Sequence, residues 1–383
     1  MDFPFSFGQK SSLLLIFFFH GIVFSFLLFR KGIFQDDKPS KWLSLLLFLC
    51  SMYIAPYMLG YANWYSGDAT GEILFFVPFM QVLVIGPVVY FYIQSLLNSD
   101  FKFSKRDWIH FIPGFLYLLY SLVVFIGDKF IFEEFYFYAD RRDKDLKTWY
   151  QLLGLTSMIY YLILSLKKYL SYKRVIFEVV SYADTILFRW IQNFLLAFLT
   201  LLIIRIIFFF SNPQWVEFGS HFWYFICFSF ILFYIAVSGY TQAIKSSSFV
   251  MTKVDESHLI PEQEKTTMSS VDIDHWKTQL ILLLEKHRIY ENPHLTLSDV
   301  AENLKTNTRL ISSVVNNGFQ MNFNDFINHY RIEAVKNKLR RGEHQTTTLL
   351  GLAYDCGFNS KATFNRAFKK STSLSPKEYI EKL

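Results

Sequence analysis

Long apolar stretches joined by short polar connections constrain this sequence more than any other feature. The hydrocarbon core of a bilayer is about 30 Å thick, so a helix needs roughly 17 to 25 mostly apolar residues to cross it. The chain is 52% hydrophobic and contains 44 Phe and 23 Tyr, which is unusual for a soluble protein. Stretches of the required length lie at 11–29, 42–61, 73–97, 108–127, 149–166, 190–210 and 222–243. The sequence therefore predicts a membrane domain of seven spanning helices within residues 1–244.

The basic residues of the connections indicate how these spans are oriented. Lys and Arg follow the first and third spans and lie between the fifth and sixth, as Arg30, Lys31, Lys38, Lys41, Lys102, Lys105, Arg106, Lys167, Lys168, Lys173, Arg174 and Arg189. Connections 62–72 and 211–221 contain no Lys or Arg. Because positively charged connections stay in the cytoplasm, we expect a multi-pass protein of the cytoplasmic membrane with its N-terminus outside and its C-terminus in the cytoplasm. Residues 1–10 lack the basic region of a signal peptide, so the first span is expected to be retained.

Few polar groups interrupt the spans. An ionisable residue inside a bilayer is costly without a partner, which makes His20 and Arg205 candidates for binding a signal ligand. The alternatives are structural, because Arg205 could extend to the outer interface and His20 could bond a neighbouring carbonyl. Connection 128–148 carries charges of both signs and is expected outside. Its aromatic run 130–138 is either an interfacial belt, which we favour, or part of a ligand surface.

The composition changes after the last span. Residues 245–270 are rich in Ser, Thr and scattered charges and predict a cytoplasmic linker, which as a flexible coil spans on the order of 25 to 30 Å. Residues 271–383 form the last expected domain, and its first helix, 272–290, either opens that domain or forms a dimer contact. Residues 275–383 hold 16 Lys and Arg against 10 Asp and Glu, which accounts for the whole formal net charge of +6. A positive excess in this domain favours binding to phosphates.

Two similar helix-turn-helix units follow in tandem. In the first, Thr296 and Asp299 have the spacing of a helix N-cap with a reciprocal carboxylate, and Asn307 can cap a second helix after a short turn. In the second, Gly357 stands where a left-handed residue ends a helix without steric cost, and Ser360 caps the next helix. Apolar residues at helical spacing are expected to form the cores: Leu297, Val300, Ala301, Leu304, Ile311, Val314 and Val315, then Leu349, Leu352, Ala353, Cys356, Phe364, Ala367 and Phe368. A long helix over 322–340 is expected to fix the spacing of the two units, with Arg331 in a structural role.

The outward face of each second helix carries small, cationic and hydrogen-bonding residues. Such a face fits a major groove, because Arg can bond O6 and N7 of guanine while Asn and Ser reach other base edges. A single unit of this kind could equally be a solvated pair of helices. Its repetition favours DNA binding.

Several segments, in this order, resemble the DNA-binding domain of the AraC family. They are 297–304 (LSDVAENL), 322–328 (NFNDFIN), 330–334 (YRIEA), 353–368 and the closing 375–379 (SPKEY). The resemblance covers roughly the last 95 residues and implies two recognition helices that enter successive segments of the major groove. Carried over by position, it implies contacts to bases or phosphates by Arg309, Ser312, Ser313, Asn316, Lys361, Ala362, Thr363, Asn365, Arg366, Lys369 and Lys370. In one respect the chain departs from the family, which usually has a glycine near Gln320.

No motif of an enzyme, a cofactor site or a metal site stands out. The three cysteines, Cys50, Cys227 and Cys356, are too few and too scattered for a disulfide framework or a zinc site. We therefore expect a protein that is not an enzyme and needs no cofactor. The expected fold class is all-α, with a polytopic transmembrane helical bundle followed by a tandem helix-turn-helix domain.

Together these features predict a bacterial, membrane-bound, one-component transcription regulator that couples a membrane or extracytoplasmic signal to gene expression. Its expected partners are double-stranded DNA, the lipid bilayer and an unknown signal ligand, with a homodimer as a further option. One alternative is a transporter or membrane enzyme whose tail regulates its own gene, and another is a tail that docks a protein. The spans lack paired helix-breaking repeats and have few buried charges, which argues against a transport path.

Overall fold

The computed structural model describes residues 7–66, 68–98, 100–132, 136–139, 143–183, 188–211, 221–246 and 270–383. These residues form helices and contain no strand, only an isolated bridge between Val180 and Thr296. The expected all-α class is confirmed. The chain divides into two compact units, the first made of 1–169 and 189–251 and the second of 170–188 and 252–383.

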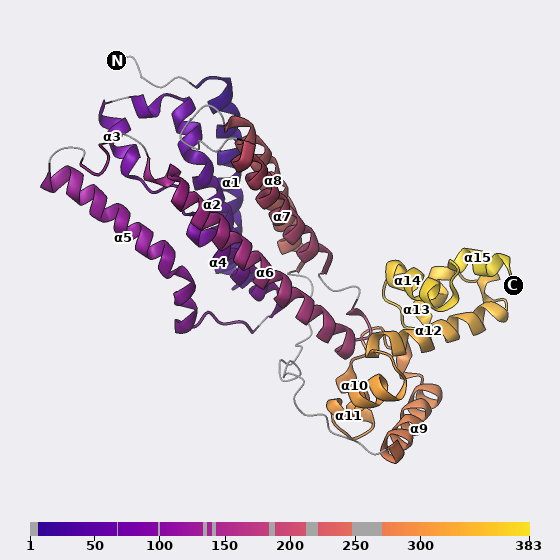
Figure 1. Cartoon of the computed structure of the whole chain (residues 1–383). Coiled ribbons are helices and arrows are strands. Elements are labelled where there is room, and N and C mark those ends of the chain that lie inside the picture. Colours follow the sequence, from indigo (N-terminus) through magenta and orange to yellow (C-terminus); the bar gives the residue numbers. More distant parts are fainter. Residues whose placement is uncertain are drawn as a thin grey trace. The chain divides into compact units, whose positions relative to one another are not determined.

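The first unit is a bundle of apolar helices (Figure 1). They are α1 (Gln9–Phe34), α2 (Lys38–Tyr61), α3 (Asp68–Phe76), α4 (Val82–Leu97), α5 (Ile112–Ile126), α6 (Thr148–Val179), α7 (Phe188–Ser211) and α8 (Phe222–Ser246), with a 3-10 helix, Lys105–Phe111, leading into α5. α6 continues beyond this unit, since its residues from Leu170 onward belong to the second. α2 packs against α1, α4 and α8, and it is the most buried of the long helices. The core of the bundle therefore forms around α2.

Small residues let α1 and α2 approach closely. A Cβ atom on Gly21 would lie 2.1 Å from Ser51 Oγ. One turn further along, Ser25 Oγ donates to Ser44 O at 2.8 Å and Ser44 Oγ donates to Ser25 O at 2.7 Å. Close backbone approach and hydrogen bonds of this kind hold helices together in lipid, where apolar burial gives no driving force for association.

Six helices among the described residues are long and apolar enough to cross a membrane, namely Gln9–Phe34, Lys38–Tyr61, Lys105–Ile131, Thr148–Val179, Arg189–Ser211 and Phe222–Ile244. They correspond to six of the seven expected spans. The expected span 73–97 is divided, because α3 ends at Phe76 and α4 begins at Val82. The total of seven spans stays a prediction.

Pro78 lies in this break, where it removes a backbone donor and restricts the preceding residue. The free backbone groups nearby have polar partners. Met80 N donates to Asp145 Oδ2 at 2.8 Å, and the Tyr150 hydroxyl donates to Met80 O at 2.7 Å. Irregular backbone at membrane depth is tolerated when it is buried in protein and bonded in this way. The pair α3 and α4 therefore has the character of one interrupted crossing.

Connection 128–148 folds against the helices through buried carboxylates. Its residues 133–135 and 140–142 lie outside the described residues. Asp145 accepts a hydrogen bond from the Tyr117 hydroxyl at 2.5 Å. Burial raises the pKa of Asp145 to about 6, and it raises the pKa of Asp143 well above the usual range.

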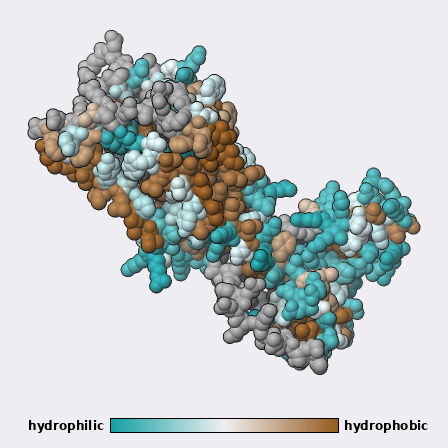
Figure 2. Space-filling view, in the orientation of Figure 1, coloured by the Kyte–Doolittle hydropathy of each residue, from teal (hydrophilic) through white to brown (hydrophobic). Residues whose placement is uncertain are grey.

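The outer surfaces of the two units differ in polarity. Hydrophobic residues cover a broad face of the first unit, whereas the visible surface of the second is largely hydrophilic (Figure 2). Large exposed apolar side chains on the spans include Ile16, Phe19, Phe26, Leu116, Leu119, Leu196, Ile207 and Phe230. An apolar surface of this extent fits lipid rather than water. It agrees with a membrane-embedded N-terminal region.

The second unit consists of shorter helices. They are α9 (Ser270–His287), α10 (Leu297–Asn303), α11 (Thr308–Ser313), α12 (Phe323–Arg340), α13 (Leu349–Asp355), α14 (Lys361–Thr372) and α15 (Pro376–Glu381). One core joins α9, α10, α11 and the first half of α12, and another joins the second half of α12 with α13 and α14. α12 thus serves both cores and fixes their spacing, as expected.

Apart from the end of α6, α9 is the first helix of this unit. Leu280 and Leu284 are fully buried in the first core, and Trp276 packs against it. The helix expected over 272–290 therefore packs into the core of this domain, as expected of its opening helix. The predicted linker 245–270 falls almost entirely on residues 247–269, which lie outside the described residues.

Candidate nucleic-acid interface

Local caps define the helices of the first helix-turn-helix unit. Thr296 N donates to Asp299 Oδ2 at 2.8 Å, and Asp299 N donates to Thr296 Oγ1 at 3.2 Å. After the turn, Leu310 N donates to Asn307 Oδ1 at 2.9 Å. Both expected caps are confirmed, and each satisfies N–H groups that a helix start leaves free.

The second unit repeats this construction. Thr363 N donates to Ser360 Oγ at 3.1 Å, which confirms the expected cap of α14. Gly357 has φ +92°, a left-handed conformation, and a Cβ atom there would lie 2.3 Å from Tyr290 O. The glycine is therefore required both by its backbone conformation and by close contact with the loop before the first unit.

The expected packing residues of both units lie in the two cores. Leu304, Leu349 and Ala367 are partly buried against them, and the others are buried. The sequence periodicity thus assigned the inner face of each helix correctly.

The outer face of α11 carries the residues expected to read DNA in the first unit. Arg309 is exposed, whereas Ser312, Ser313 and Asn316 are half-buried. Asn316 Nδ2 donates to Ser312 Oγ at 3.3 Å, so the two side chains are ordered relative to each other. From Val314 the helix widens into a π-turn that ends at Gly318.

The outer face of α14 presents most of the second set. Its exposed members are Lys361, Ala362, Asn365, Arg366, Lys369 and Lys370. Thr363 differs, because it is only 1% exposed and accepts a hydrogen bond from Ser360 Oγ at 2.9 Å. Its position three residues after the cap, where it bonds Ser360 and lies next to Phe364, turns the side chain inward. Thr363 is therefore removed from the expected contact surface.

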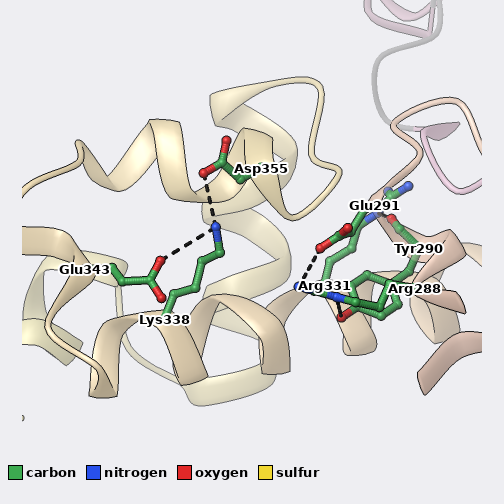
Figure 3. A network of polar contacts seen from close by, with 7 residues as sticks. All are labelled: Arg288, Tyr290, Glu291, Arg331, Lys338, Glu343 and Asp355. Atoms are coloured by element: carbon green, nitrogen blue, oxygen red, sulfur yellow. Dashed lines mark hydrogen bonds and ion pairs between the residues drawn. The ribbon is translucent and has the colours of Figure 1, made fainter. Parts of the chain in front are cut away.

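Ion pairs attach the second helix-turn-helix unit to α12. Lys370 Nζ lies 2.6 Å from Asp325 Oδ2, which links the end of α14 to the start of α12. Lys338 lies between Glu343 and Asp355, at 3.7 and 3.1 Å (Figure 3). These pairs help to hold α14 at a defined place on the connecting helix.

Arg331 lies where the two helix-turn-helix units meet, and it is 1% exposed. Its Nε donates to Tyr290 O at 2.8 Å, seen in Figure 3, and Nη2 donates to Asn292 O at 2.7 Å. The guanidinium also lies 5.8 Å from the ring centroid of Phe358, in the turn of the second unit. Burial lowers the pKa of Arg331 to about 9, which still leaves it charged at neutral pH. The structural role expected for Arg331 is that of a hydrogen-bonded centre between the units.

This geometry agrees with the family comparison. Residues 300–382 match the model of a family described as a helix-turn-helix domain. The C-terminal part of the chain is an AraC-type helix-turn-helix domain. This domain type is typical of DNA-binding transcription regulators and is not typically enzymatic, and it implies double-stranded DNA as a partner. No curated protein and no solved structure matches the chain.

The membrane unit contains a second candidate site around Arg205. This side chain is only 4% exposed, so it does not extend to the interface. Its Nη1 donates to the Tyr53 hydroxyl at 2.9 Å, and its Nη2 donates to Gln151 Oε1 at 2.5 Å. Tyr53 in turn shares a hydrogen bond with Tyr224 at 3.2 Å, and Gln151 Nε2 donates to Asp145 O at 2.5 Å. The network joins α2, α6, α7 and α8 to connection 128–148.

His20 is placed differently. Its ring lies 4.5 Å from the ring centroid of Phe24 and 4.4 Å from that of Phe233. Within the described part of the chain, neither ring nitrogen has a hydrogen-bond partner. The neighbouring carbonyl considered as an alternative is therefore not bonded.

Sequence reasoning named Arg205 but missed the residues that surround it. Tyr53 and Gln151 lie on two apolar helices and are 98 positions apart in the chain, and periodicity alone does not show that they meet. Among the residues that the structure covers, no group of three or more His, Cys, Asp or Glu could hold a metal ion.

Proposed function

We propose that the protein is a membrane-bound transcription regulator in which the N-terminal helices sense a signal and the C-terminal domain reads DNA. The observation that carries the proposal is the combination, in one chain, of six long apolar helices and two recognition helices with exposed polar faces. A domain that binds DNA gains from a membrane tether when the tether reports on the membrane or its outside.

Contacts between the residues that follow α6 and the DNA-binding domain support the predicted orientation. Residues 180–183 follow α6 and bond directly to the DNA-binding domain, so this connection and the domain must lie on the same side of the membrane. In the chain, α7 and α8 lie between residues 180–183 and the DNA-binding domain. Each of these two helices would cross the membrane once, which returns the chain to the side where it started. The helix ends that flank this connection carry Lys167, Lys168, Lys173 and Arg174 on α6 and Arg189 on α7, which supports a cytoplasmic location for both. With α3 and α4 as one crossing, the N-terminus would be outside.

We also propose where the reader meets DNA. Arg309, Ser312, Ser313 and Asn316 would contact one segment of the major groove. Lys361, Ala362, Asn365 and Arg366 would contact the next, with Lys369 and Lys370 on phosphates. A second copy of the chain, paired through its spans, would bind paired sites.

Genome-wide DNA occupancy of the full-length protein tests this proposal. We expect discrete peaks for the unaltered chain and their loss in a Lys361→Ala, Arg366→Ala double variant, because both side chains lie on the exposed face of α14. A Lys377→Ala, Lys382→Ala double variant removes the same charge from exposed positions outside the recognition helices and should keep the peaks. Equal occupancy in all three proteins would contradict the proposed reading surface.

The signal site is proposed around His20 and Arg205, with Arg205 the more constrained of the two. Target genes from the occupancy experiment provide a reporter. Arg205→Met should hold its output at one level across growth conditions, because it breaks the network that joins four helices. Arg189→Met, at an exposed position on the same helix, should leave the response unchanged. A normal response of the Arg205→Met protein would exclude this site.

A further inference from the structure

The connection between α6 and α7 is built into the DNA-binding domain. Val180 forms a bridge with Thr296, and Ser181 N donates to Leu295 O at 3.1 Å. Beside this bridge, the ring of Tyr182 lies 5.3 Å from that of His294. Antiparallel pairing of this kind places the side chains of opposed residues next to each other.

The same connection completes the bonding of Arg331. Nη2 donates to Ser181 Oγ at 2.9 Å and Nη1 donates to Ser181 O at 3.2 Å. Asn324 Nδ2 also donates to Val180 O at 3.4 Å. Ser181 and Ala183 are fully buried, and Val180 is 1% exposed. The connection therefore occupies the joint between the two helix-turn-helix units as an integral part.

We propose that residues 180–183 complete the DNA-reading domain and that α6 acts through them on the joint between its two helix-turn-helix units. This inference rests on the proposed function and names how the reader is regulated. α6 is one continuous helix from Thr148 to Val179 that is long and apolar enough to cross a membrane. Its next residue is the one that bridges to the reader.

Docking of residues 180–183 on the DNA-binding domain favours DNA binding for a physical reason. A buried guanidinium is costly unless its N–H groups are bonded, and removal of a partner from such a group loosens the structure around it. Without Ser181, Arg331 loses two of its acceptors at the place where both units meet. Two recognition helices bind neighbouring groove segments only when their spacing is held. A signal that displaces α6 would therefore release DNA.

The first experiment tests docking of the full-length protein in membranes. Tyr182→Cys and His294→Cys place thiols on opposed side chains, within reach of a disulfide. A protease site inserted in residues 247–269 separates the chain into two fragments unless the disulfide joins them. We expect the fragments to stay joined until reductant is added. Tyr182→Cys with His344→Cys, in the turn beyond α12, is the matched control and should separate. Separation of the first pair without reductant would overturn docking.

The second experiment removes docking. Ser181→Pro deletes the N–H that bonds Leu295, whereas Ser181→Ala keeps the backbone bonds and removes one acceptor of Arg331. At equal membrane levels, full-length Ser181→Pro in lipid nanodiscs should bind its operator about tenfold more weakly, and Ser181→Ala less than about threefold. In the proline variant, the disulfide between positions 182 and 294 should restore affinity, and reductant should abolish the gain.

The outcomes separate this inference from the proposed function. Wild-type affinity of Ser181→Pro overturns the inference, and so does a loss of affinity that the disulfide does not restore. If the unaltered protein occupies no discrete DNA sites, the proposed function fails. The cross-linking result then still decides whether residues 180–183 dock on the domain.

Discussion

Individual residues in left-handed conformations show where the chain accepts backbone strain. Gln320 has φ +56° and Gly357 has φ +92°. The first stands close to where the AraC family usually has a glycine, and its conformation explains that preference. A residue with a Cβ atom pays roughly 1 to 2 kcal/mol in this region, whereas glycine does not.

Gln320→Gly is therefore expected to stabilise the first helix-turn-helix unit by roughly 0.5 to 1 kcal/mol, after the greater freedom of glycine in the unfolded chain is subtracted. Hydrogen exchange of the buried amides of α10 and α12 in the full-length protein measures the change. Gln345→Gly is the matched control, since Gln345 is exposed and not left-handed, and it should give no gain. Slower exchange in the control alone would refute this explanation.

Gly357→Ala should have the opposite effect. The substitution adds the left-handed penalty and brings a Cβ atom to 2.3 Å from the backbone oxygen of Tyr290. We expect a loss of about 2 kcal/mol or more, measured by the same exchange. Gly351→Ala, inside α13 and at an ordinary helical φ, should change stability much less. Similar effects of both substitutions would argue against the close contact between the units.

At the scale of elements, each of the two recognition helices is positioned by a cap at one end and by its own core behind it, and α12 contributes to both cores. α14 carries base-edge and phosphate candidates on one exposed face, and these should be separable by salt. Each phosphate contact releases counterions and steepens the salt dependence of binding, whereas base contacts set sequence preference.

Lys369→Ala should weaken binding of the full-length protein to all DNA sequences alike and reduce the slope of log affinity against log salt by roughly 1. Arg366→Ala should instead cost about 1 to 3 kcal/mol at the preferred sequence and relax the choice at one base pair. Titrations at several salt concentrations with operator and scrambled DNA measure both. Lys382→Ala, at the C-cap of α15, is the control and should change neither quantity. A uniform loss for Arg366→Ala would assign it to a phosphate.

The short helix α15 depends on a capping box. Ser375 N donates to Glu378 Oε2 at 2.7 Å, and Glu378 N donates to Ser375 Oγ at 3.3 Å. The hydrogen bonds from the Ser375 backbone and hydroxyl lower the pKa of Glu378 below 4.5. Because the pKa of Glu378 is lower in the folded than in the unfolded state, its charge stabilises α15 fully above pH 4.5. This stabilisation is lost as the pH falls through the folded-state pKa.

We therefore expect hydrogen exchange of α15, corrected for the intrinsic effect of pH, to speed up below pH 4.5 while α12 stays protected. Glu378→Gln keeps the size of the side chain and removes its charge, so its exchange should be faster at neutral pH and lose this pH dependence. Glu381→Gln is the matched control on the same helix and should behave like the unaltered protein. If exchange of α15 in the Glu378→Gln protein still sped up below pH 4.5, the acid response would belong to another ionisable group.

At the scale of the whole molecule, the open question is whether α3 and α4 together cross the membrane once. Asn63 precedes them and Lys102 follows them, and both are exposed. If the interrupted pair crosses, these two positions lie on opposite sides. If it does not, they lie on the same side, and the total number of crossings becomes even.

We expect a cysteine at Asn63 to react with a membrane-impermeant maleimide in intact cells, and a cysteine at Lys102 to react only after the cells are opened. A cysteine at Ser373, in the DNA-binding domain, should behave like the one at Lys102. The unaltered protein is the control, since Cys50 and Cys356 are buried and Cys227 is partly so. Labelling of positions 63 and 102 from the same side would contradict the predicted topology.

The sequence by itself determined the local structure of this protein. Helix caps at Thr296, Asn307 and Ser360, the left-handed Gly357 and the buried faces of α10 to α14 depend on residues a few positions apart, so spacing was enough to predict them. Length and apolarity predicted seven spans for the same reason, and six of them are long helices among the described residues. Length and apolarity could not show the break at Pro78, because the backbone groups of Met80 beside it are bonded by Asp145 and Tyr150, which are far away in the chain.

Only the tertiary structure decided which distant residues meet. Arg205 was recognisable as a buried charge, but its partners Tyr53 and Gln151 were not, because any polar residue on an apolar helix could have faced it. Thr363 has the composition of a contact residue, yet the cap of its own helix turns it inward. Ser181 and Arg331 are 150 positions apart and joined by hydrogen bonds that no periodicity encodes. Such pairings depend on how helices pack, and packing is a property of the whole fold rather than of any stretch of sequence.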